Sequence, residues 1–277
     1  MHFGVRMGIT PHINAICKKS KSIFSQLARI TKARWGLNTS VMETMYKCVF
    51  LPVVAYAAAG WVDKINAYHR KQLTQAQRYA LLRVTKAYRT VSSDALCVIA
   101  SAKPIELILE ERKSFYFLRK GKTFNLLGKQ YILNQGITNR EIDQIKSSIY
   151  QYTRNAWQRK WKATEEGRIT YQFFNNIEDR EKASWVRNNY CIVQALSGHG
   201  NFNSKLKKFR LSETDLCTCG TVDNVNHVIF ECSNIEDLRN DLKQSVESYS
   251  LLWPCKNRDL VSNEIYGQFA KFVTNAL

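Results

Sequence analysis

Residues 64–88, KINAYHRKQLTQAQRYALLRVTKAY, decide the fold class of this chain. Leu73, Ala80 and Val84 recur at helical spacing, so they share one apolar face. A helix with one apolar face buries that face against other elements and leaves the opposite side to solvent or to a ligand. The stretch therefore predicts an amphipathic helix that packs into a larger helical core.

A basic stripe runs along the other side of the same predicted helix. Lys64, Lys71 and Arg78 recur every seven residues, nearly opposite the apolar face. Further basic residues add charge around this stripe: Arg70, Arg83, Lys86 and Arg89. A second basic amphipathic stretch, later in the chain, contains Lys205, Lys207 and Lys208. Such stripes either contact phosphates or are solvated faces, and the residues alone leave both alternatives open.

Helical patterns in the rest of the chain predict a mainly α fold. Pro11 can open a helix, residues 38–40 can cap another, and Ser92 and Pro104 precede two more. We expect helices at residues 11–32, 41–59, 94–100, 104–120, 140–162, 178–196 and 234–248, and one near the C-terminus. Residues 1–10 are predicted to be the end of a strand and a loop, residues 121–140 a linker, and residues 165–174 a turn with a short strand-like piece.

The charge is unusual for a chain of 277 residues. The net charge is +18, with a sequence pI near 9.6. Residues 1–100 contain 15 basic and 3 acidic side chains, whereas residues 101–277 contain 26 and 20. An excess of one sign attracts polyanions, so we expect RNA and DNA as partners, bound through the backbone and largely without regard to sequence. A diffuse basic surface without such a partner is the alternative.

The apolar segments are short. The most apolar run, Val49–Ala59, has eleven residues and contains Pro52, whereas a membrane span needs roughly 20 residues. The N-terminus lacks the apolar core of a signal peptide. We therefore expect no membrane partner and an intracellular protein, nuclear or cytoplasmic, with reduced cysteines. Of these, Cys17, Cys48, Cys97 and Cys191 are predicted to be buried thiols.

Residues 216–232, LCTCGTVDNVNHVIFEC, have the residue types and spacing of a metal site. Three thiolates and one imidazole are a common ligand set for structural zinc, and these positions supply them: Cys217, Cys219, His227 and Cys232. Gly220 can adopt the left-handed backbone of a tight knuckle, and Asp223 can cap a short helix that carries His227. That helix must end before Cys232. Buried free thiols with a surface histidine are the alternative.

No constellation of residues marks a catalytic site. A polymerase needs clustered carboxylates for two metal ions, and the acidic pairs of this chain are expected to be solvated surface charge. These pairs are Glu110–Glu111, Glu165–Glu166, Glu178–Asp179 and Glu236–Asp237. His199 in the glycine-rich SGHG turn is expected to stabilise that turn. We predict that the chain alone is inactive.

Several segments together resemble the C-terminal part of the reverse transcriptase of non-LTR (LINE-type) retrotransposons, of the insect jockey- or I-like kind. The segments are YKCVFLPVVAYAAAGW (46–61), residues 69–112, WQRKWKATEEGRITYQFF (157–174), LSGHGNFNSKLKKFRL (196–211) and the cysteine stretch. The resemblance covers the chain from about residue 3 to residue 232. It implies a palm-strand remnant at 1–9, a thumb-like helical bundle at 10–125, a connector at 126–210, a CCHC zinc knuckle at 211–240 and a helical tail at 241–277.

This resemblance implies a function in which a basic helical clamp and a zinc knuckle hold primer–template or target nucleic acid. The palm with its metal-binding aspartates is absent, and the segment after the knuckle is too short for an appended nuclease domain, so we expect a truncated element copy or a host-retained fragment. Two alternatives remain open. In the first, the chain is a zinc-stapled protein-interaction module. In the second, it is a fragment that completes a reverse transcriptase in trans with a palm-containing chain.

Overall fold

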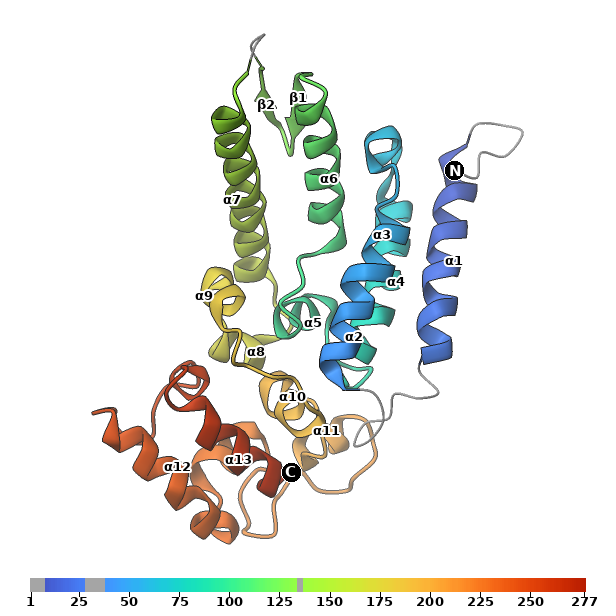
Figure 1. The fold of residues 1–277 in the computed structure, drawn as a ribbon. Helices are drawn as coiled ribbons and strands as arrows, with labels where there is room; N and C mark the ends of the chain where they lie inside the picture. The colour runs from blue at the N-terminus through green and yellow to red at the C-terminus, as the bar shows by residue number, and fades with distance from the viewer. Residues whose placement is uncertain (1–7, 28–37, 134–136) are drawn as a thin grey trace. The chain divides into compact units, whose positions relative to one another are not determined.

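The structure, a computed structural model, describes residues 8–27, 38–133 and 137–277 (Figure 1). Apart from one two-stranded sheet, the regular structure in these residues is helical, which confirms the mainly α fold. The chain divides into two compact units. Unit 1 comprises residues 1–84 and 102–163, and unit 2 comprises residues 85–101 and 164–277. The division into palm remnant, thumb, connector, knuckle and tail stays a prediction.

Unit 1 is built from long helices and one hairpin. Its elements are α1 (Ile9–Leu27), α2 (Thr39–Met45), a π-helical turn (Tyr46–Phe50), α3 (Leu51–Val54), 3-10 turns at Ala58–Gly60 and Val62–Lys64, α4 (Ala67–Thr85, whose last residue belongs to unit 2), α6 (Ile105–Arg119), β1 (Phe124–Leu126), β2 (Lys129–Tyr131) and α7 (Asn139–Ala163). Helix α6 lies against α7, β1 and both 3-10 turns, so it forms the centre of this unit (Figure 1).

A buried glutamine of α4 fixes the start of α6. The Gln77 amide accepts a hydrogen bond from Ile105 N at 2.8 Å and donates to the Lys103 carbonyl and the Tyr46 hydroxyl, both at 2.8 Å. An amide group buried this deeply costs free energy unless its donors and acceptor are paired. Here each bond satisfies a group of another element, so Gln77 specifies how these elements meet.

The acidic pair on α6 is buried, and the prediction that it is solvated surface charge was wrong. Glu110 and Glu111 are 6% and 7% exposed. Glu111 pairs with Lys103, and Glu110 pairs with Lys113 at 2.8 Å. Burial opposes the charge of Lys113, but hydrogen bonds to Asp63 and Glu110 outweigh it and raise the pKa of the ammonium group. Lysine partners therefore neutralise the charges of Glu110 and Glu111 inside the unit.

The predicted linker at residues 121–140 contains a hairpin. Strands β1 and β2 pair antiparallel, and Leu126 opposite Lys129 closes the turn. Both turn residues have positive φ, +49° at Leu127 and +88° at Gly128, which is the backbone of a tight two-residue hairpin. The Asn125 side chain accepts a hydrogen bond from Gly128 N at 2.8 Å. Leucine at a left-handed position is rare, so the residue types around this turn do not predict it.

One helical stretch of unit 1, Thr39–Gly60, is long and apolar enough to cross a membrane by length and composition alone. It is longer than the eleven-residue run expected from the sequence. Asn38 caps its start as predicted, accepting from Ser40 N at 3.1 Å. Every fourth side chain is buried, so one face of this stretch packs into the unit: Met42, Tyr46, Phe50, Val54 and Ala58. Cys48 is exposed, so its prediction as a buried thiol was wrong.

Unit 2 is built from shorter helices. Its elements are α5 (Ser93–Ile99), α8 (Arg168–Phe173), α9 (Ile177–Lys182), α10 (Tyr190–Ser197), α11 (Asn203–Lys208), a π-helical turn (His227–Glu231), 3-10 turns at Ser233–Ile235 and Asp259–Val261, α12 (Glu236–Ser248) and α13 (Tyr266–Ala276). Helix α10 is apolar and contacts α5, α8 and α13, while α12 packs against α13. The core of unit 2 therefore surrounds α10.

Some predicted elements differ from the structure. Residues 168–173 form helix α8 rather than a strand-like piece, and the predicted helix at 178–196 is two helices separated at Ala183–Asn189. Asn189 caps the second of these, accepting from Ile192 N at 2.7 Å. The predicted strand end at residues 1–10 lies outside the described residues except at its end, where α1 already begins at Ile9.

Candidate metal centre

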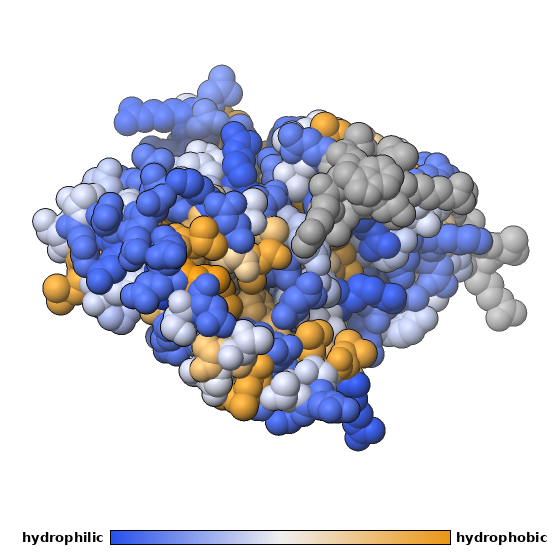
Figure 2. Space-filling view, turned by 90° about the horizontal axis from the view of Figure 1, so that it is seen from below, coloured by the Kyte–Doolittle hydropathy of each residue, from blue (hydrophilic) through white to orange (hydrophobic). Residues whose placement is uncertain are grey.

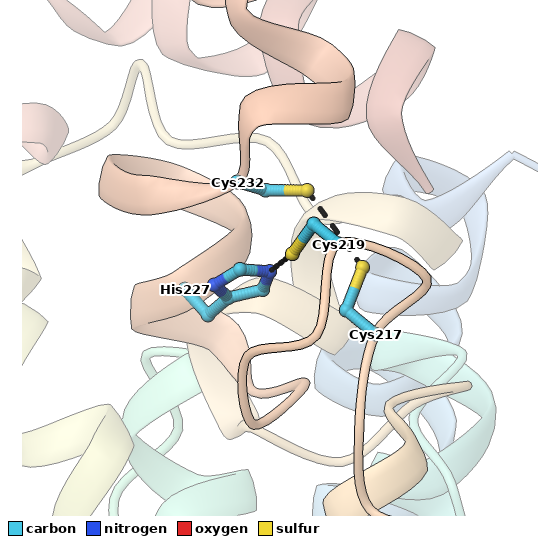
Figure 3. A group of neighbouring side chains, drawn as sticks. All are labelled: Cys217, Cys219, His227 and Cys232. Carbon is cyan, nitrogen blue, oxygen red and sulfur yellow. Dashed lines mark hydrogen bonds between the residues drawn. The ribbon is translucent and has the colours of Figure 1, made fainter.

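The four predicted metal ligands converge in unit 2 (Figure 3). Their ligand atoms all lie within 4.8 Å of one another. Cys217 Sγ is 3.7 Å from Cys232 Sγ, and Cys219 Sγ is 3.3 Å from His227 Nε2. Within the described ranges, no other group of three or more cysteine, histidine or acidic side chains has this arrangement. The cluster could hold a metal ion.

Two of the distances are close to those between ligands of a tetrahedral ion. Zinc–sulfur bonds of about 2.3 Å and zinc–nitrogen bonds of about 2.0 Å place neighbouring tetrahedral ligands roughly 3.5–3.8 Å apart. The sulfur–sulfur separation of 3.7 Å matches this edge, and the sulfur–nitrogen separation of 3.3 Å is slightly shorter. Protein atoms fill all four positions, which is the arrangement of a structural rather than a catalytic site.

A tight turn presents the first two cysteines. Leu216 and Val222 form an antiparallel bridge, and Cys217 N donates to the Thr221 carbonyl at 2.8 Å. Gly220 N donates to the Cys217 carbonyl at 2.9 Å, with φ +91° at the glycine. A side chain is strained at this φ, so Gly220 allows the chain to reverse between the ligands, as the sequence predicted.

The last two ligands come from a helical turn and its end. The cap of this turn is Asn224, whose side chain accepts from His227 N at 3.1 Å, and the prediction of Asp223 as the cap was wrong. Cys232 leaves the helix in an extended conformation, and its N donates to the His227 carbonyl at 2.8 Å. The wider π-helical turn and this break bring Cys232 back toward His227, which a regular helix would not do.

A buried arginine that the sequence did not single out supports this turn. Arg239, on α12, donates from Nε to the Ile229 carbonyl at 2.8 Å and from Nη2 to the Cys232 carbonyl at 2.6 Å. Burial lowers the pKa of its guanidinium, although nearby negative groups, Cys232 first, oppose this. The basic and the apolar positions on α12 each recur every four residues, as on many surface helices, so no sequence signal identified this role.

Asp223 links the loop that carries Cys217 and Cys219 to the basic helix α11. Its carboxylate accepts from Asn203 N at 2.8 Å, and its carbonyl accepts from Ser204 N at 3.1 Å. The Asn203 side chain donates to the Leu216 carbonyl at 2.8 Å. These bonds satisfy amide groups at the start of α11 with atoms of the loop that carries Cys217 and Cys219. The loop therefore fixes where α11 begins.

The thiols of the cluster differ in acidity. A hydrogen bond from the Thr221 backbone amide, aided by the neighbouring thiols, lowers the pKa of Cys219 to about 7. Burial raises the pKa of Cys232, and the neighbouring thiols raise it further. A metal ion would have to displace the protons of these groups, since thiolates are the ligands.

The candidate nucleic-acid contacts of unit 1 lie on and before α4. Lys71 is exposed, whereas Arg70 and Arg78 are half-buried. Lys64 lies in the 3-10 turn before α4, so it does not continue the helical stripe. Arg83 folds back over the Tyr79 ring, 3.5 Å from its centroid, and Nη1 donates to the Tyr79 carbonyl at 3.0 Å.

The remaining candidate contacts belong to unit 2. Lys86 and Arg89 follow α4, and Lys86 has φ +57°. On α11, Lys207 pairs with Asp215 at 2.8 Å, whereas Lys208 is exposed and Lys205 is half-buried. The structure therefore separates the ten predicted positions into one set in each unit. Their role in binding stays a prediction.

The chain is similar to Pol polyproteins of insect R1 retrotransposable elements. It is 32% identical to the Retrovirus-related Pol polyprotein from type-1 retrotransposable element R1 4 of Nasonia vitripennis, over 87% of this chain and 61% of that protein. It is 27% identical to the corresponding R1 2 protein of the same wasp, over 98% and 66%. It is 28% identical to the Putative 115 kDa protein in type-1 retrotransposable element R1DM of Drosophila melanogaster, over 84% and 23%.

The chain spans about three fifths of the length of the first of these relatives and just under two thirds of the second. No protein-family model matches it. No solved structure matches it either. The match nevertheless extends over most of this chain, and it recurs in the proteins of several retrotransposable elements. The homologues of this chain are therefore Pol polyproteins of R1 non-LTR retrotransposons, consistent with a retrotransposon reverse transcriptase region, which confirms the resemblance that its sequence predicts.

Proposed function

We propose that this chain is the nucleic-acid-binding part of a retrotransposon RNA-directed DNA polymerase. It grips primer–template or target nucleic acid through basic helical surfaces and through a knuckle stapled by structural zinc. Net charge of +18 on a homologue of Pol polyproteins is the observation that carries the proposal. Lysine and arginine side chains bind phosphates and release counterions, which gives affinity without sequence specificity.

The surface supports this proposal. Hydrophilic residues cover most of the face drawn in Figure 2, and hydrophobic residues show on it in smaller groups. On α4, Lys71 is exposed and makes no ion pair within the residues described. Lys208 is likewise exposed on α11. Cations without a carboxylate partner can bind phosphate groups.

The metal-binding cluster supports the zinc part of the proposal. Three sulfur ligands and one imidazole are softer than the oxygen ligands that Mg²⁺ and Ca²⁺ require. Zinc bound at the cluster supplies folding free energy, because the four ligands converge only in the folded knuckle. We propose no catalytic role for this zinc. We also propose that the protein is intracellular.

Binding to labelled RNA, single-stranded DNA and duplex DNA at low salt tests the proposal. A chain with Lys71→Gln and Arg78→Gln should lose affinity about equally for all sequences, since phosphate contacts do not read bases. Lys146→Gln is the matched control, because Lys146 already pairs with Asp143 at 2.9 Å. Affinity no tighter than micromolar at low salt would favour the protein-interaction alternative.

Primer extension separates a third outcome. The chain alone should not extend a primer, since none of its acidic pairs forms a two-metal site within the described residues. Extension that begins only when a palm-containing chain is added would show that the fragment completes a polymerase in trans.

A further inference from the structure

The end of α11 exposes an aromatic ring between basic side chains. Phe209 directly follows α11 and is 48% exposed. Lys208 precedes it and Arg210 follows it, and both are exposed. Phe209 N donates to the Lys205 carbonyl at 3.2 Å, which places Lys205 one helical turn earlier. Other large apolar side chains of this chain are also exposed, and the feature that distinguishes Phe209 is the set of basic residues around it in the sequence.

The cations around this ring lack acidic partners. Among the residues that the structure describes, Lys205, Lys208 and Arg210 form no ion pair, whereas Lys207 pairs with Asp215. Burial, and then the charge of Lys208, lower the pKa of Lys205. Like charges held side by side repel each other, and an anionic ligand would relieve this repulsion. The neighbourhood therefore fits a polyanion.

The backbone holds the ring in place. Arg210 N donates to the Lys207 carbonyl and Leu211 N to the Leu206 carbonyl, both at 2.9 Å. This is the pattern that closes a helix with a left-handed residue, and Arg210 takes that position with φ +58°. The other end of the helix is held by the metal-binding loop through Asp223. The exposed ring thus lies at the end of a helix that is fixed at both ends.

We propose that Lys205, Lys208, Phe209 and Arg210 form a binding site for single-stranded nucleic acid. A base stacks on the Phe209 ring, and the cations contact the phosphates on either side. Only a single strand offers an unstacked base face, because the bases of a duplex already stack on each other. This inference rests on the proposed function and names the class of nucleic acid that this site takes.

Fluorescence anisotropy of the full chain with a labelled oligothymidylate, and with a duplex of the same length, tests the proposal. Phe209→Ala should weaken binding of the single strand about tenfold or more and leave duplex binding within about threefold, since one stacked base contributes that much. Phe209→Tyr should bind as the original chain does. Tyr249→Ala is the matched control, because Tyr249 is 52% exposed in the same unit.

The outcomes are distinguishable. Single-strand binding that is unchanged in Phe209→Ala overturns this inference while the proposed function stands. An equal loss for single strand and duplex overturns the assignment of the site to single strands. An original chain that binds neither nucleic acid at low salt overturns the proposed function and this site with it. Circular dichroism should show that Phe209→Ala keeps its helices, since Phe209 lies outside the buried core.

Discussion

Replacement of Arg239 by methionine should weaken metal binding without removing a ligand. The guanidinium of Arg239, which is 6% exposed, donates to the carbonyls of Ile229 and Cys232, and at 3.3 Å to that of Val228. Hydrogen bonds from a charged group contribute about 1.5–3 kcal/mol each, so the two short ones stabilise the turn by roughly 3–6 kcal/mol. Methionine avoids the desolvation cost of a buried cation, which offsets part of this loss.

We therefore expect a net loss of about 2–3 kcal/mol, and a zinc affinity lower by about 30- to 150-fold. Competition with a chromophoric chelator at fixed pH measures the dissociation constants. Arg239→Lys keeps the charge but not the forked donors, so its zinc affinity should lie between those of the original chain and Arg239→Met. Lys243→Met, an exposed position on the same helix, is the control. If Arg239→Met folds and binds zinc within about threefold of the original chain, Arg239 does not hold this turn.

Two further predictions concern the knuckle and the fold of unit 2. Metal analysis of the purified protein should find close to one zinc per chain. The zinc should be lost in Cys219→Ser but kept in Cys48→Ser, since Cys48 lies far from the cluster in sequence and belongs to unit 1. Purified protein without zinc would contradict the knuckle assignment. Gly198→Ala should lower the midpoint of thermal unfolding, because an added Cβ would lie 2.8 Å from Ile169 Cγ1 and Gly198 has φ +68°. Gly267→Ala should change the midpoint little, since nothing lies within 4 Å of a Cβ added there. Equal midpoints of the two variants would contradict the view that Gly198 is required in the SGHG turn.

Local signals in the sequence predicted much of the fold. The Ser92 side chain accepts from Ala95 N at 3.2 Å, and α6 begins directly after Pro104, as their residue types predict. The convergence of Cys217, Cys219, His227 and Cys232 was also predictable, because cysteines and histidines at short spacings are typical of a metal site. Such signals act within a few residues, so the sequence alone contains them.

Contacts between distant residues were not predictable. In the sequence, Glu111 resembles a surface charge, because its partners Lys103 and Thr153 come beside it only in the folded unit. Asp223 and Asn224 are both good capping residues, and only the position of α11 decides that Asn224 caps the ligand-bearing turn while Asp223 bonds to Asn203. Such choices depend on tertiary packing, which overrides local preference.

The salt dependence of nucleic-acid binding tests the central claim most directly. The logarithm of the association constant is measured against the logarithm of salt concentration for a single strand and a duplex. If basic surfaces grip phosphates, the slope is steeply negative, about −0.9 for each phosphate contacted in a duplex and about −0.7 in a single strand. It should become shallower when Lys71 and Arg78 are replaced. An affinity that stays constant between low and physiological salt would contradict the account.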